Sequence, residues 1–233
     1  MLNFSGISTE DQPRIVPGGR ESTFGLFIIY VVTFHVVWAV WPFVIYPRLQ
    51  GIGERTFRYA VANLTIRLAV WVAPVLLFLR WIDGVDPLGY LKLHPRIGKG
   101  VVIGLVLTAL NLLGMCARFG LPHFSLERVT WNSMLGTSFL VGLIEEVPYR
   151  GFMLRKFTER YGFWRANAIT SFLFVAVHLP GWIALHTFRL DTAATILIFG
   201  AVMAIVFRYS ESLWATIVTH SGNDFLSFVL FRM

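Results

Sequence analysis

The chain has 233 residues, of which 56% are hydrophobic and only 14% are charged, and its mean hydropathy is +0.65. This composition excludes a soluble globular body with one or two anchors and indicates a polytopic membrane protein. The net charge of +7 includes no long basic tract, so we do not expect nucleic acid as a partner. The single cysteine, Cys116, excludes an internal disulfide and a thiolate metal cluster.

Seven apolar segments are long enough to cross a membrane as helices. They predict an all-α transmembrane bundle in one domain, residues 24–233, after a polar N-terminal tail over residues 1–23. A short apolar piece, Gly181–Phe188, follows a predicted helix stop at Pro180; we expect it to lie at the interface or to re-enter, and counted as a span it would make eight. The seven segments are Phe24–Tyr46, Tyr59–Leu79, Lys99–Ala117, Asn132–Glu159, Trp164–Leu179, Asp191–Phe207 and Leu213–Phe231.

The distribution of basic residues predicts the orientation of this bundle. With seven spans, eleven Lys and Arg residues fall on the side of the N-terminus and seven on the opposite side. Cytoplasmic loops carry the excess of Lys and Arg in membrane proteins. We therefore expect a multi-pass integral membrane protein with a cytoplasmic N-terminus, in the cell membrane if the source is prokaryotic.

The fourth segment contains two adjacent glutamates with different surroundings. Glu146 and Arg150 are four residues apart, a spacing that favours an ion pair on one helix face. Glu145 points about 100° away from Glu146, so we expect it to lack that partner and to be free for chemistry. Pro148 cannot donate to the carbonyl of Ile144, which predicts a bend beside Glu145.

A hairpin brings the second candidate residue to the same depth. Glu145 lies 17 residues before Gly162, and His178 lies 16 residues after it. If the chain turns at Gly162, both side chains are about 25 Å from the turn on neighbouring antiparallel helices. Phe174, four residues before His178, is placed to pack on the imidazole ring.

The last helix supplies a further polar face, because His220 and Asp224 are again four residues apart. Ionisable side chains within a span cost about 2.5 to 3.5 kcal/mol each, so they need a reason to be there. We expect one polar chamber inside the apolar core, formed by Glu145, Glu146, His178, His220 and Asp224.

A simpler interpretation is that these residues only pack helices. A buried glutamate–arginine pair is often structural. An isolated His35 in the first helix, Arg67 in the second and His186 near the interface are each more typical of packing, ion pairing or snorkelling than of catalysis. A functional site is favoured instead, because three carboxylates and two histidines are expected at similar depths in the membrane.

These residues form three motifs that resemble the CAAX prenyl protease and bacteriocin-processing (CPBP or Abi) family of intramembrane endopeptidases. The motif EExxxR is similar to Glu145–Arg150, FxxxH to Phe174–His178, and the later motif, a His followed four residues on by Asn or Asp, to His220–Asp224. Three motifs in this order on three helices make the resemblance specific. It implies hydrolysis of a peptide bond inside the membrane.

The resemblance also implies a role for each motif. Glu145 and His178 would activate a water, and His220 with Asp224 would stabilise the oxyanion. The chain departs from the prenyl protease pattern because Asp224 stands where an Asn is expected. Either Asp224 is protonated, or Asn223 takes the role, or Asp224 orients His220. The candidate catalytic residues are Glu145, Glu146, His178, His220, Asn223 and Asp224, with Glu146 and Arg150 as the structural ion pair.

Two other hypotheses remain open at the level of sequence. A zinc ion that activates a water could also be bound here, by Glu145, His178, His220 and Asp224. The HExxH pattern that is common in zinc proteases is absent, and the favoured mechanism requires no cofactor. A bacteriocin self-immunity factor or other non-catalytic scaffold would use the polar chamber for packing alone. The expected partners are the lipid bilayer and a membrane-associated or lipidated peptide or protein substrate.

Overall fold

The computed structural model describes residues 20–94 and 96–231, so the predicted tail lies outside the described residues up to position 19. Within these ranges the chain forms helices and no strand, which confirms the all-α prediction. The elements are α1 (Arg20–Val40), η1 (Trp41–Ile45), α2 (Tyr46–Gln50), α3 (Phe57–Arg67), η2 (Leu68–Val72), α4 (Ala73–Leu77), η3 (Phe78–Ile82), α5 (Pro87–Tyr90), α6 (Ile97–Phe119), η4 (Leu126–Arg128), η5 (Ser133–Thr137), α7 (Val141–Glu146), η6 (Val147–Met153), α8 (Leu154–Tyr161), α9 (Phe163–Ala176), α10 (Leu179–Leu185), α11 (Leu190–Ser210), α12 (Leu213–Leu226) and η7 (Ser227–Phe231).

Several of these elements join end to end, and two of the π-helical turns contain a proline. Pro42 lies in the first turn of η1, and Pro148 lies in the first turn of η6. A proline has no backbone N–H and would clash in a regular α-helix, and a π-turn relieves this by inserting one residue. The predicted bend near Pro148 is therefore a change to π-helix over Val147–Met153.

Five helical rods are long and apolar enough to cross a membrane. The two other predicted spans, residues 132–159 and 213–231, are largely helical and carry four of the five residues of the predicted chamber; the fifth, His178, lies in one of the five rods. This arrangement confirms a polytopic membrane protein. The five rods are Thr23–Gln50, Phe57–Ile82, Ile97–Phe119, Phe163–Leu185 and Leu190–Ser210.

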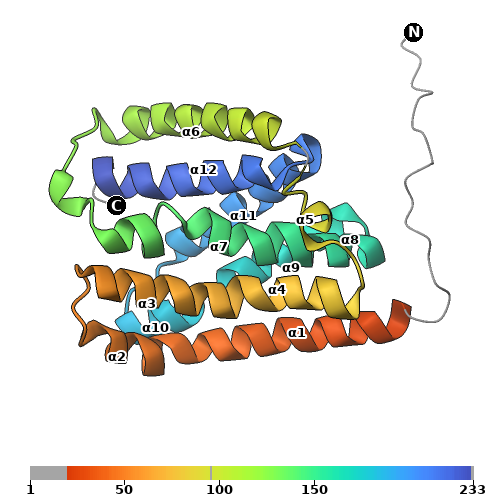
Figure 1. Ribbon diagram of the computed structural model, residues 1–233. Helices are drawn as coiled ribbons and strands as arrows, with labels where there is room; N and C mark the ends of the chain where they lie inside the picture. The colour runs from red at the N-terminus through yellow and green to blue at the C-terminus, as the bar shows by residue number, and fades with distance from the viewer. Residues whose placement is uncertain (1–19, 95, 232–233) are drawn as a thin grey trace, which may run out of the picture.

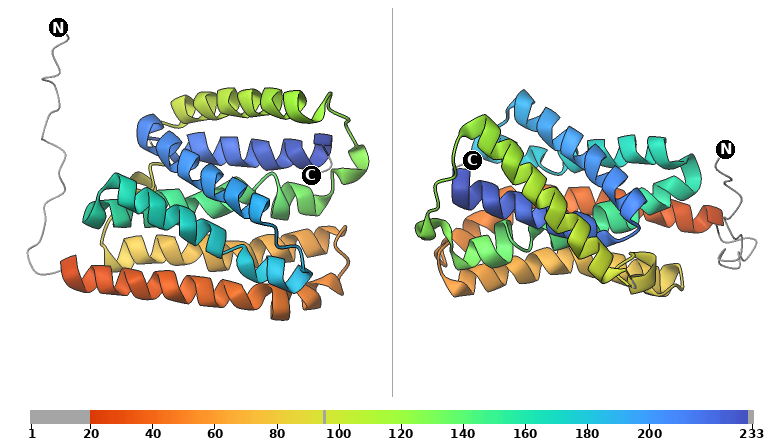
Figure 2. Two further views of the ribbon diagram at one scale, coloured as in Figure 1. Left: turned by 180° about the vertical axis from the view of Figure 1, so that it is seen from behind. Right: turned by 90° about the horizontal axis from the view of Figure 1, so that it is seen from above.

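The rods form a layered bundle with α7 and η6 at its centre. In Figure 1, α1 and the rod of α3 and α4 form one side, and α6 with α12 forms the other. Seen from behind, α9 and α11 cover the central helix, as Figure 2 shows. Large aromatic side chains fill the space around η6, including the fully buried Trp71, Tyr149 and Phe152.

Two predicted helix boundaries are wrong. The segment 132–159 is not one continuous helix, because a bend and turn at Ser138–Leu140 separate η5 from α7. The predicted stop at Pro180 is also misplaced: α9 ends at Ala176, and Pro180 lies in the first turn of α10. Proline is favoured at the start of a helix, where its missing N–H would be unpaired anyway. The short piece Gly181–Phe188 is therefore mostly the end of the rod Phe163–Leu185, and not a separate element.

Candidate active site

Glu146 is fully buried and bonded to two partners. Its Oε1 accepts a hydrogen bond from Arg150 Nη1 at 2.9 Å, so the predicted ion pair within the helix is present. The same oxygen lies 2.7 Å from His220 Nδ1 of α12. Because a carboxylate oxygen accepts, His220 carries its proton on Nδ1, and its Nε2 faces the opposite direction.

Glu145 is not free, and this prediction is wrong. Its Oε1 accepts a hydrogen bond at 3.1 Å from Nη2 of Arg67, which belongs to α3. Both side chains are buried. The partner was missed because it is 78 residues away, and helical spacing within the fourth segment reports nothing about it. Asn63 and Arg67, four residues apart in an otherwise apolar span, were a signal of a polar face on that helix.

His220 Nε2 faces the carboxylates of Glu145 and Asp224. Glu145 Oε2 lies 3.9 Å from this nitrogen, and Asp224 Oδ2 lies 3.6 Å from it. Both separations exceed the length of a direct hydrogen bond. The structure therefore brings four of the predicted residues together, namely Glu145, Glu146, His220 and Asp224.

Asn223 is engaged on both ends of its amide. Its Nδ2 donates to Asp224 Oδ1 at 2.9 Å, and its Oδ1 accepts from Asn111 Nδ2 of α6 at 2.5 Å. Sequence reasoning missed Asn111, although a polar residue in the apolar third span pointed to an inward contact. Asn223 thus links α6 to Asp224 at the edge of the site, where about a third of the Asp224 side chain is exposed.

His178 lies at the break between α9 and α10, and its Nδ1 is hydrogen bonded to the Phe174 carbonyl at 2.7 Å. A carbonyl can only accept, so Nδ1 carries the proton and Nε2 of the neutral ring keeps its lone pair. The ring of Phe174 contacts both histidines, with centroid separations of 5.2 Å to His178 and 6.0 Å to His220. The predicted packing of Phe174 on His178 is confirmed.

The hairpin that carries Glu145 and His178 has the expected turn and register. Gly162 separates α8 from α9 with a φ of +76°, a conformation that glycine adopts without strain. Further from the turn, the Tyr149 hydroxyl donates to the Leu173 carbonyl at 3.3 Å. One helical turn beyond this contact lie Glu145 on one helix and Val177 on the other, next to His178.

The isolated histidine of the first helix has a packing role. His35 Nδ1 lies 2.8 Å from the Val31 carbonyl, and its Nε2 lies 3.3 Å from the Leu173 carbonyl and 3.2 Å from the Tyr149 hydroxyl. These contacts join α1 to η6 and α9. His35 therefore supports the helices that carry the site, as the packing interpretation expected.

Part of the predicted zinc donor set is already bonded within the protein. Over residues 20–94 and 96–231, no group of three or more His, Cys, Asp or Glu side chains is arranged to hold a metal ion. Each glutamate is bonded to an arginine, and His220 Nδ1 is directed at Glu146. Zinc sites instead direct three or four such donors at a common centre.

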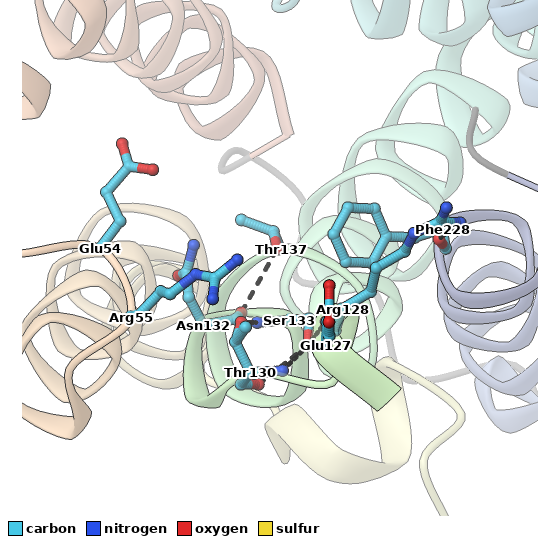
Figure 3. Close-up of a pocket in the computed structure, with 9 residues that line it drawn as sticks. All are labelled: Glu54, Arg55, Glu127, Arg128, Thr130, Asn132, Ser133, Thr137 and Phe228. Atoms are coloured by element: carbon cyan, nitrogen blue, oxygen red, sulfur yellow. Dashed lines mark hydrogen bonds between the residues drawn. The ribbon is translucent and has the colours of Figure 1, made fainter. Parts of the chain in front are cut away.

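A separate pocket of about 220 Å³ lies at the end of the bundle (Figure 3). It is lined by Glu54 and Arg55 of the loop before α3, by residues within 127–137, and by Phe228. None of the candidate catalytic residues lines it. The pocket adjoins η5, whose Gly136 carbonyl accepts a hydrogen bond from Arg67 Nη1.

Comparison with known protein families gives a match that covers the polar helices. Residues 127–226 match the family described as Type II CAAX prenyl endopeptidase Rce1-like. The matched segment contains all three motifs, from Glu145 to Asp224. Neither the curated proteins nor the solved structures gave a match. Because the family is one of proteases, the match supports a CAAX-type intramembrane endopeptidase in general terms. Residues 127–226 are therefore similar to the Rce1-like CAAX endopeptidase family, and the resemblance that the three motifs indicate is confirmed over this segment.

Proposed function

We propose that this protein is an intramembrane endopeptidase that hydrolyses a peptide bond of a membrane-associated or lipidated protein or peptide. The observation that carries the proposal is the cluster around His220 Nε2, where Glu145 and Asp224 oxygens lie 3.9 and 3.6 Å away inside a helical bundle. This cluster lies within the segment that matches the protease family.

The reaction needs a base that takes a proton from the attacking water. Glu145 offers Oε2, because its Oε1 is bonded to Arg67. His178 offers the lone pair of Nε2, because its Nδ1 proton is bonded to the Phe174 carbonyl. The water oxygen attacks the scissile carbonyl carbon as its proton passes to this pair, and the same proton then reaches the departing amine nitrogen.

The negative charge that develops on the carbonyl oxygen needs donors. His220 is held by Glu146 through Nδ1, so a proton on its Nε2 would point at the site. Asp224, when protonated, or the amide of Asn223 would supply a second donor beside it. Donors fixed in a site that excludes water stabilise such an oxyanion strongly.

We propose that this hydrolysis needs no metal. Arg67 already neutralises Glu145, the one glutamate among the four residues that would bind a divalent cation. We expect the activity of purified protein to survive exhaustive chelation and dialysis. Loss of activity on chelation, with recovery on addition of zinc alone, would contradict the metal-free mechanism.

The orientation of the chain is part of the same proposal: the N-terminus lies in the cytoplasm. The excess of basic residues indicates which end of the bundle faces the cytoplasm. The short loops at the other end give exposed test positions such as Gly51. In a Cys116→Ser background, a cysteine at position 51 is expected to react with a membrane-impermeant maleimide in intact cells. Protection of that cysteine until the cells are broken would reverse the orientation.

The decisive test of function compares protein termini in cells that express the wild type or Glu145→Gln. New C- or N-termini that depend on Glu145 would identify the substrate, and synthetic peptides across that junction would then be cleaved by purified protein. The absence of any Glu145-dependent terminus, with both proteins equally abundant, would favour the non-catalytic scaffold.

A further inference from the structure

We propose that Arg67 is a positioning residue for the reaction, which fixes Glu145 so that its second carboxylate oxygen faces the water. This inference rests on the proposed function. Arg67 belongs to α3 and lies outside the matched segment 127–226. It acts through Glu145 and does not itself touch the reacting atoms.

The guanidinium of Arg67 is held on several sides. The Arg67 residue is 9% exposed, and its guanidinium lies over the indole rings of Trp38 and Trp71, with Cζ 5.6 and 5.8 Å from the ring centroids. Nη1 donates to the Gly136 carbonyl, and Nη2 donates to Glu145 Oε1. Cation–π contacts and a fixed acceptor for Nη1 leave the group little freedom to move.

A fixed guanidinium makes the two oxygens of Glu145 unequal. Arg67 occupies Oε1 at 3.1 Å, and Oε2 is the oxygen that faces His220 Nε2 at 3.9 Å. Without Arg67, the carboxylate could rotate and offer either oxygen to neighbouring groups. A displacement of about 1 Å of a catalytic group can lower turnover by about 10²-fold.

Arg67 also contacts η5, so a merely structural role must be separated from positioning. Asn63, one turn earlier on the same face of α3, makes such a structural contact: its Nδ2 donates to Asn132 Oδ1 at 2.9 Å. A Cβ added at Gly136 would lie 2.5 Å from both of those amides, so α3 and η5 are closely packed. Asn63→Ala therefore weakens the same contact between α3 and η5 without touching Glu145, and it is the matched control.

The test measures kcat, KM and thermal unfolding of wild type, Arg67→Lys, Arg67→Gln, Asn63→Ala and Glu145→Gln on one peptide cleaved by the wild type. We expect kcat to fall by about 10²-fold in Arg67→Gln, with KM within about threefold of wild type. Arg67→Lys keeps the cation but loses the paired donors, so its kcat is expected to lie between those of the wild type and Arg67→Gln. Asn63→Ala is expected to lower the unfolding temperature and to keep its kcat.

The outcomes separate this inference from the proposed function. Wild-type kcat in both Arg67 variants, with Glu145→Gln inactive, would overturn positioning and leave the protease standing. Activity in Glu145→Gln would overturn the protease mechanism itself. If Arg67→Gln does not fold, Arg67→Lys decides: a lower kcat than that of Asn63→Ala supports positioning, and an equal kcat overturns it.

Discussion

The two adjacent glutamates of the central helix have the same chemistry and opposite surroundings. Glu146 pairs with Arg150 of the adjoining η6 and with His220 of α12, both through the same oxygen, and it is fully buried. Glu145 pairs with Arg67 from a distant part of the chain and directs its other oxygen at the site. On the proposed mechanism, an ion pair does not by itself make a glutamate structural. The difference lies in the second oxygen, which faces His220 Nε2 in Glu145 and is buried without a hydrogen-bond partner in Glu146.

The largest difference is expected in turnover. Glu145→Gln removes the proposed base and keeps the shape of the side chain, so kcat should fall by about 10²- to 10⁴-fold. The amide can still accept a hydrogen bond from Arg67, and we expect near-normal expression. Peptide cleavage by purified protein, with thermal unfolding as the control, tests this. If Glu145→Gln lowered the unfolding temperature as much as the loss of the Glu146–Arg150 pair does, the distinction between a catalytic Glu145 and a structural Glu146 would be wrong.

The second difference is expected in stability, at the other glutamate. Arg150→Ala leaves the fully buried Glu146 without its cation, and Glu146→Gln leaves the buried Arg150 without the negative charge of its partner. Removing one partner of a buried pair costs about 3 to 5 kcal/mol. Unfolding temperature and yield in detergent measure the loss. Glu146→Gln should also lower turnover, because Glu146 fixes the His220 ring, whereas a wild-type yield with reduced turnover alone would make Glu146 purely a positioning group.

Sequence patterns predicted the parts of the site that depend on spacing along one helix. The pair Glu146 with Arg150, the packing of Phe174 on His178 and the turn at Gly162 all follow from helical geometry or from the conformational freedom of glycine. The all-α membrane bundle followed from composition and apolar run length alone. These features need no knowledge of how distant helices pack.

The parts that failed depend on contacts between distant segments. No periodicity connects Arg67 of α3 with Glu145 of α7, so the partner of Glu145 came only from the packed structure. The turn at Ser138–Leu140 is similar, because apolar composition continues through it. The break before Pro180 falls at Val177 and His178, since proline starts a helix as readily as it ends one.

The smallest effect is expected at Asp224, where the chain departs from the family pattern. Asp224 Oδ1 accepts from Asn223, and Oδ2 lies 3.6 Å from His220 Nε2. Asp224→Asn can keep the first contact and places an N–H₂ donor near the second, so a site that uses a protonated Asp224 should keep most of its activity.

An ionised Asp224 would give a different result in the same experiment. Its charge would support a protonated His220, and the asparagine would remove that support while leaving the shape unchanged. Turnover would then fall by tenfold or more, a barrier change of about 1.4 kcal/mol. We expect the smaller effect, because the family accepts Asn at this position. A tenfold loss of kcat in Asp224→Asn, with unchanged yield and unfolding temperature, would instead assign Asp224 to the orientation of His220. Asp224 would then be a carboxylate that acts through its charge on a neighbouring histidine, as Glu146 does, and not on the substrate, as is proposed for Glu145.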